Sequence, residues 1–513
     1  MSTTRYRHLK AGLLALLWLA AYALTVDSVF PRGDDLAHLV ADRAVPIPQR
    51  GLWVANRVID GFFTAFTFQA FESLYSVVPG IRAGRDFVDL FRAFNALIYA
   101  TALGCAAALL CRSLRVWIRK GLLQFLFAWL AGLGALFQWM PPNVGMTELF
   151  AYQVTAVITI AFLSIAYPMI DPGGDAMGQP AAERFSGSTY LLLSLLAYLT
   201  AVGLEAFVAF AWLYIAAHYA TSSGFFLRRS RASPGPRSMF PSTFRDSLNR
   251  HTIALQFLVY SIWSIHALTT SGRTRVGLAA GPQSVSWSDV LELTLMAIRS
   301  PGAQLVALVL VFCAGFGLLR SVHLAGVDRG LMIGRNALVS QFAFSLVVGA
   351  GYLAGLVALG AVTRIDYVND AKLVFPLKFV LLVQLLALSL SLLSALTSGA
   401  MKRIAVVVVF AWCAAVVASQ MSVATGQREA ARQVRDAFQR AALAQGNVVG
   451  VPFPLPQAIP ANEGYPLLPA ANAADWYRRS YRLMLNKFYG THFDSSGPVF
   501  SAQDDAVVPR PAR

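Results

Sequence analysis

Charged residues are scarce in this sequence. Asp, Glu, Lys and Arg make up 13% of its 513 residues, whereas about 25% is usual in a soluble domain. Hydrophobic residues make up 57%, and they gather in runs of about 20 residues, the length that an α-helix needs to cross a bilayer. The low charge therefore excludes an ordinary soluble domain and predicts an all-α polytopic membrane protein.

Motifs of several enzyme and transporter classes are missing as well. The sequence has no Gly-Lys-Ser/Thr phosphate loop, no His-Glu-x-x-His pair and no Gly-x-Ser-x-Gly elbow. These absences weigh against ATP-driven transport, zinc proteolysis and serine hydrolysis. Cysteine is rare, and the four cysteines lie in or at the end of apolar runs without metal-site spacing. We interpret them as packing residues: Cys105, Cys111, Cys313 and Cys413.

The formal net charge of +16 does not predict a nucleic-acid partner, because the basic residues cluster in short segments between apolar runs. Membrane orientation and anionic lipids explain that pattern better. Arg5, Arg7 and Lys10 precede the first apolar run, as in a signal peptide. No small-residue cleavage site follows, so we expect a retained first span.

About eleven membrane spans are predicted, with the N-terminus in the cytoplasm and the C-terminus outside the plasma (inner) membrane. Reading 189–220 as two short helices places every basic cluster on the cytoplasmic side, whereas reading it as one span inverts the topology after it. The spans fall near 11–30, 87–111, 120–140, 147–170, 189–201, 204–220, 252–270, 302–320, 337–362, 376–397 and 402–420. The domains expected are a first span (1–30), an external loop (31–86), a helix bundle (87–420) and an external C-terminal segment (421–513).

This topology exposes a set of charged residues on the outer face. The loop 31–86 contains Asp34 and Asp35, and its stretch 53–76 has the mixed pattern of a helix lying in the membrane interface. The C-terminal segment should begin with an amphipathic helix at 424–446. Further candidates are found near predicted span ends and in two other external loops: Glu148, Glu205, Arg273, Arg275 and Arg364.

Asp34 and Asp35 have more than one candidate role. A carboxylate at a membrane edge can be a general base for a hydroxyl acceptor, and two together can hold a divalent ion such as Mg²⁺ or Mn²⁺. The alternative is an ordinary solvated loop. His38 either orients a carboxylate or is an interface histidine.

The other charged candidates also have alternative interpretations. Glu148 and Glu205 either serve substrate or are hydrated residues at helix ends, where a first-turn acid is favourable. The three arginines Arg273, Arg275 and Arg364 either bind a lipid phosphate or are hydrated loop residues.

The order of these features resembles the GT-C superfamily of membrane glycosyltransferases, in a poorly characterised bacterial branch. The similarity consists of Gly33-Asp34-Asp35 after the first span, Arg92-Ala93-Phe94-Asn95 opening the second, and Ser271-Gly272-Arg273-Thr274-Arg275, which lacks the family's Pro. It ends with Asp475-Trp476 and Lys487-Phe488-Tyr489-Gly490, where Tyr477 replaces an Asn and Phe488 a Tyr.

The resemblance implies a sugar transfer from a polyprenyl-phosphate carrier to a glycan, lipid or protein acceptor of the cell envelope. It implies that Asp34 or Asp35 is the catalytic base or a metal ligand. Two alternatives stay open: a transporter or flippase of lipid-linked glycan, and a non-catalytic envelope assembly protein. A transporter predicts polar residues in the middle of several spans.

Overall fold

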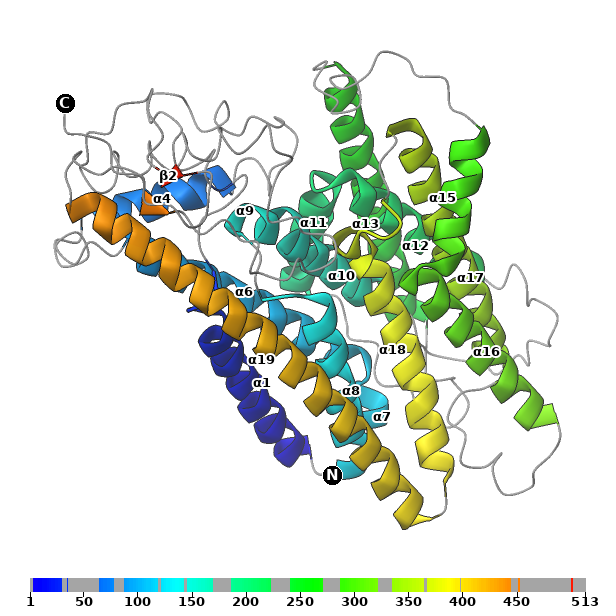
Figure 1. Ribbon diagram of the computed structural model, residues 1–513. Helices are drawn as coiled ribbons and strands as arrows, with labels where there is room; N and C mark the ends of the chain where they lie inside the picture. Colours follow the sequence, from blue (N-terminus) through cyan, green and yellow to red (C-terminus); the bar gives the residue numbers. More distant parts are fainter. Residues whose placement is uncertain are drawn as a thin grey trace. The chain divides into compact units, whose positions relative to one another are not determined.

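The computed structural model describes an all-helical chain apart from one pair of two-residue strands (Figure 1). The strands, β1 (Val451–Pro452) and β2 (Phe500–Ser501), pair in parallel. The all-α membrane class is therefore confirmed in its coarse form. The residues described are 3–29, 35, 64–77, 87–118, 121–142, 145–168, 186–222, 240–270, 287–321, 335–363, 367–396, 398–443, 451–452 and 500–501.

Within these residues, 8 helices are long and apolar enough to cross a membrane. They are α1 (Thr3–Thr25), α6 (Phe87–Ser113), α8 (Leu122–Trp139), the continuous segment of α9 (Met146–Glu148), η2 (Leu149–Val154) and α10 (Thr155–Ala166), then α16 (Pro301–Ser321), α17 (Arg335–Thr363), α18 (Ala371–Ala395) and α19 (Gly399–Leu443). The other helices are α4 (Thr64–Val77), α7 (Arg115–Ile118), α11 (Gly187–Ala201), α12 (Glu205–Ser222), α13 (Phe240–Thr270) and α15 (Trp287–Arg299).

The segment 189–220 forms two helices, as predicted. Helix α11 ends at Ala201, and α12 starts at Glu205. A Cβ on Gly203 would lie 2.8 Å from Thr155 Cγ2, so glycine lets this turn approach α10 closely. Helix α11 has 15 residues, fewer than the roughly 17 a span needs, and the total of about eleven spans stays a prediction.

Two predicted boundaries differ from the structure. Helix α1 begins at Thr3 and ends at Thr25, earlier than the predicted 11–30, because the helix includes the basic residues before the apolar run. The predicted span 402–420 and amphipathic helix 424–446 form one helix, α19, of 45 residues. No proline interrupts it, and its polar part is rich in Ala, Gln, Glu and Arg, which are strong helix formers.

The contacts divide the chain into two compact units. Unit 1 contains 1–11, 105–139 and 154–414, and unit 2 contains 12–104, 140–153 and 415–513. In unit 1, α18 is the central helix. In its apolar stretch, 89% is buried inside the protein, and the helix contacts α8, α10, α12, α16 and α17. Hydrogen bonds between different segments of unit 1 support this packing, as is usual in membrane bundles. Tyr352 donates to Leu373 O, and Tyr214 donates to Tyr167 O.

Unit 2 has an aromatic core between α4 and the start of α6. Phe71 is fully buried, and its ring meets Phe87 and Phe91 edge-on at centroid distances of 5.1 and 5.9 Å. Tyr75 packs on Phe87 in the same manner, at 5.5 Å. The predicted interfacial helix 53–76 is thus helical from Thr64 onward, and its residues 53–63 lie outside the described part.

We expect Phe71→Ala to destabilise unit 2 by about 3 kcal/mol, since it removes a buried ring and leaves a cavity. Phe66, on the same helix, is 52% exposed, and Phe66→Ala should cost under about 1 kcal/mol. Thermal unfolding in detergent, followed by intrinsic fluorescence, to which the buried Tyr75 of unit 2 contributes, measures both variants. Equal shifts for the two variants would contradict this packing.

Candidate active site

Asp35 is a buried carboxylate that holds the start of a membrane helix. Its side chain is 1% exposed, and it accepts hydrogen bonds from Met146 N at 3.2 Å, Thr147 N at 2.8 Å and Thr147 Oγ1 at 2.8 Å. Met146 begins the continuous helix that ends at Ala166. The first N–H groups of a helix lack partners within the helix, and a carboxylate there also interacts favourably with the helix dipole.

The sequence explains why a distant residue takes this role. The N-cap of the helix is Gly145, with φ −63° and ψ 161°, and it has no side chain to accept a hydrogen bond. A Cβ on Gly145 would lie 2.6 Å from Asp35 Oδ2. Glycine is therefore required here for close approach of the Asp35 carboxylate, not for its backbone angles.

Gly145→Ala should displace Asp35 from the helix and lower stability by about 1–3 kcal/mol, the usual cost of overpacking a buried contact. Gly315 is the matched control, because nothing lies within 4 Å of a Cβ built there, and Gly315→Ala should be neutral or slightly stabilising. The thermal unfolding midpoints of the two variants measure this difference in stability. A Gly145→Ala protein as stable as Gly315→Ala would refute the close contact.

The same helix contains a π-helical segment directly after Glu148. Leu149–Val154 forms the π-helix η2, a conformation found mostly as short segments and often at functional sites. Gln153 in this segment is 5% exposed and donates to Pro141 O at 3.3 Å, while its Oε1 has no hydrogen-bond partner among the described residues. The π segment thus ties the helix to the turn that precedes Gly145.

Arg92 joins the end of α1 to α6. Its Nε donates to Val26 O at 3.0 Å, one terminal nitrogen to Asp89 Oδ1 at 2.9 Å, and the other to Asp27 Oδ1 at 3.1 Å. Its side chain is 4% exposed, whereas those of Asp27 and Asp89 are 61% and 35% exposed. The planar guanidinium suits this set of three acceptors.

One further hydrogen bond on α6 fixes the segment that leads to Gly145. Tyr99, about two turns after Arg92, donates to Met140 O at 2.8 Å. Unit 2 thus contains two sets of polar contacts, one around Asp35 and one around Arg92.

The C-terminal part of α19 belongs to the same unit and also meets the end of α1. Arg428 donates to Ala23 O at 3.1 Å, one of the last carbonyls of α1, which lack partners within the helix. The C-terminal part of α19 is therefore fixed beside the end of α1, shortly before Asp27.

The predicted site residues fall in three groups. Asp35 and Glu148 lie in unit 2, where Glu148 is half-buried and follows Thr147 directly. Glu205 lies in unit 1, exposed at the start of α12. The rest lie outside the described residues: Asp34, His38, Arg273, Arg275 and Arg364.

Sequence reasoning missed the partners that hold these acids. Thr147 and Gly145 carried no motif, although Gly145 follows a Pro-Pro pair and precedes an apolar run, a pattern that predicts a helix start. Asp27 carried no signal of its own in the sequence, and Arg92 stood out only through the family resemblance. A basic residue in the first turns of a predicted span is the sequence signal that could have identified Arg92 and its acidic partners.

The described residues do not fit a divalent metal. No group of three or more His, Cys, Asp and Glu lies close enough together among them. Asp35 accepts three hydrogen bonds, which occupy most of the lone pairs of a carboxylate. Asp27 and Asp89 already share the positive charge of Arg92. We therefore derive no catalytic step through a metal.

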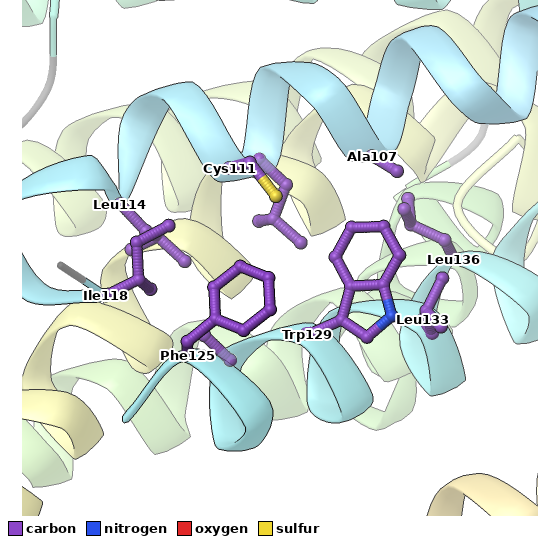
Figure 2. A pocket seen from close by; sticks show the side chains of 10 residues that line it. Ala107, Cys111, Leu114, Ile118, Phe125, Trp129, Leu133 and Leu136 are labelled. Carbon is purple, nitrogen blue, oxygen red and sulfur yellow. The ribbon is translucent and has the colours of Figure 1, made fainter. Parts of the chain in front are cut away.

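Two hollows in unit 1 contain no charged side chain. Figure 2 shows the first, a gap of about 10 Å³ between α6, α7 and α8 lined by apolar residues such as Leu114, Phe125 and Trp129. It has room for about one water but no polar partners for it. The second, of about 610 Å³, is lined by α15, α16 and α17 with Ala, Leu, Ile, Val and a single Thr. Such linings hold hydrocarbon and offer no group for chemistry.

Comparison with known proteins gives no match: no family model, curated protein or solved structure is similar to this chain.

Proposed function

We propose that the protein is a membrane glycosyltransferase of the GT-C kind, which transfers a sugar from a polyprenyl-phosphate carrier to an envelope glycan, lipid or protein acceptor on the outer face. The observation that carries the proposal is the buried, anchored Asp35 at the first residues of a membrane helix. Ionisable groups at such positions are costly to maintain and are typically functional.

The reaction is a direct displacement at the anomeric carbon of the sugar. A carboxylate of the pair Asp34 and Asp35 takes the proton of the acceptor hydroxyl, and the acceptor oxygen bonds to the anomeric carbon. The bond from that carbon to the phosphate oxygen breaks, and polyprenyl phosphate leaves with the electron pair. Basic side chains such as Arg273, Arg275 and Arg364 neutralise the departing phosphate.

We assign the base to Asp34 and a positioning role to Asp35. The oxygens of Asp35 already accept three hydrogen bonds, so its lone pairs are largely occupied and its carboxylate is fixed. Asp34 is its covalent neighbour, and consecutive Cα atoms are about 3.8 Å apart. Anchoring Asp35 to the helix therefore restricts where the carboxylate of Asp34 can be.

A transporter or flippase of lipid-linked glycan is the second candidate, and one observation favours it. Gln341, Ser345 and Gln384 are buried inside the spans α17 and α18, where Ser345 donates to Gln384 Oε1 at 2.5 Å. Within the part of the chain that the structure describes, both polar atoms of Gln341 lack hydrogen-bond partners. This group is uncharged and lies in two helices only, whereas a transport path needs polar groups in several spans.

The proposal is tested in cells by deletion and complementation. Deletion of the protein should remove or truncate one envelope glycan, and the wild-type protein should restore it. The double variant Asp34→Asn/Asp35→Asn, at a matched protein level in the membrane, should not. Full restoration by the double variant would show that the protein acts without these carboxylates and would leave the enzyme proposal without its base.

A further inference from the structure

The groove of about 610 Å³ between α15, α16 and α17 follows half of a membrane span; it is here called the α15 groove. Its α17 wall consists of six residues on successive turns of one helix face: Ala350, Leu353, Ala354, Val357, Ala358 and Ala361. All of them fall in the second half of the span Leu338–Ala361. From the first to the last, an α-helix rises roughly 17 Å. The α15 groove therefore has about the length of the hydrocarbon in one leaflet, which is half of roughly 30 Å.

The sequence explains why α15 does not continue into α16. Ser300 Oγ accepts a hydrogen bond from Ala303 N at 3.2 Å, as an N-cap does, and Pro301 has no N–H group with which to extend α15. A Cβ on Gly302 would lie 3.0 Å from Val374 Cγ1, so α16 begins in close contact with α18. Helix α15 is thus a separate element of 13 residues, and the α15 groove separates it from the small side chains of α17.

The α15 groove is open and almost wholly apolar. Ala354 and Ala358 on its α17 wall are exposed, so a ligand can reach them. Among the described residues that line the groove, none is charged, and the single hydroxyl, on Thr294, donates to Val290 O at 2.6 Å within α15. A molecule that enters therefore meets hydrocarbon and no polar group in need of a partner.

We propose that the α15 groove binds one acyl chain of a bilayer phospholipid. The groove matches a leaflet in length, its walls are hydrocarbon, and phospholipid is the molecule that a bilayer presents at a lateral opening. Lipid tails are as apolar as these walls, so the chain is held by packing: it gains dispersion contacts from three helices at once. A carrier lipid with a terminal phosphate is the less favoured occupant, because the walls offer no cation for that phosphate. The inference concerns unit 1 alone and does not depend on sugar transfer.

The test fills the α15 groove with side chains of the protein. Ala354→Phe/Ala358→Phe places two rings on the α17 wall, and Ala314→Phe is the matched control, because Ala314 is exposed on the span α16 but does not line the groove. Each full-length protein is reconstituted with phosphatidylcholine, transferred to detergent and analysed by native mass spectrometry. We expect the wild type and the control to retain one phospholipid. The double variant should bind it about 10-fold more weakly, the effect of losing about ten carbon–carbon contacts.

Equal retention of phosphatidylcholine by all three proteins would overturn the proposal. In a mixture of phosphatidylcholine and undecaprenyl phosphate, retention of undecaprenyl phosphate in preference to phosphatidylcholine would overturn the assignment to an acyl chain. Thermal unfolding gives a second readout, since a ligand of the folded state raises stability. Added phosphatidylcholine should raise the unfolding midpoint of the wild type and of Ala314→Phe more than that of the double variant, whose rings already occupy the groove. The same rise in all three would refute the inference.

Photolabelling uses the wild type alone, so it does not depend on the folding of a variant. A phosphatidylcholine with a diazirine in one acyl chain is carried through the same detergent transfer and then irradiated. We expect the label on residues 290–298 of α15 and 350–361 of α17, with little on Val311 and Leu318, which are each 66% exposed on α16 outside the groove. Label spread evenly over both sets would show lipid bound to the whole surface and would contradict a site in the α15 groove.

Discussion

Asp34→Asn is expected to reduce sugar transfer by about 10²- to 10⁴-fold, the range that a general base contributes, while leaving stability within about 0.5 kcal/mol of wild type. Asp35→Asn should instead act mainly on stability. It replaces an acceptor-only carboxylate, which is 1% exposed and accepts three hydrogen bonds, by a group with one acceptor and a donor. We expect it to cost about 2–3 kcal/mol of stability.

The two variants are compared by initial transfer rate per folded molecule and by thermal unfolding midpoint. A matched control is Thr147→Val, which removes one of the three donors to Asp35 and should cost about 1 kcal/mol without a change in rate per folded molecule. If Asp35→Asn abolished transfer at full stability and Asp34→Asn were active, the roles assigned to the two carboxylates would be reversed.

Arg92→Ala is expected to lower stability by about 2–4 kcal/mol. Breaking a buried ion pair by removing one partner commonly costs about 3–5 kcal/mol. The lower range applies because the side chains left behind, Asp27 and Asp89, are 61% and 35% exposed and can be hydrated. Val26 O would also lose its donor, Arg92 Nε.

Arg92→Lys keeps the positive charge but cannot serve three acceptors in a fixed plane, so we expect it to recover only part of the loss. Asp27→Asn tests the exposed side of the same pair and should cost under about 1 kcal/mol. Denaturation in detergent or lipid nanodiscs gives all three values. A stability of Arg92→Ala within about 0.5 kcal/mol of wild type would mean that this cluster does not fix the end of α1.

The helical elements could be predicted from the sequence because apolar runs and helix breakers specify them locally. The pair of short helices at 189–220 was instead predicted from the distribution of the basic residues, and the structure turns between Ala201 and Glu205. The continuity of α19 was missed because the composition changes from apolar to polar near Gln420, although helix propensity continues across that change and the helix ends only at Leu443.

The sequence singled out Asp35 by residue type and position but did not reveal its contacts. Two acids after a first span indicate a functional edge, and Asp35 is buried among the described residues. Its partner Thr147 is separated by more than a hundred residues in the sequence, and no periodic pattern links such positions.

The most direct test of the central claim is sugar transfer by the purified protein in detergent, where no bilayer separates two compartments. Undecaprenyl-phosphate-linked sugars are supplied as donors, membranes from a strain lacking the protein supply the acceptors, and released undecaprenyl phosphate is quantified by mass spectrometry. The account predicts release by the wild type that requires the acceptor membranes and is lost in Asp34→Asn. Intact donors with the wild type, in a preparation that moves the same lipid-linked sugars across a liposome membrane, would contradict it and identify a transporter.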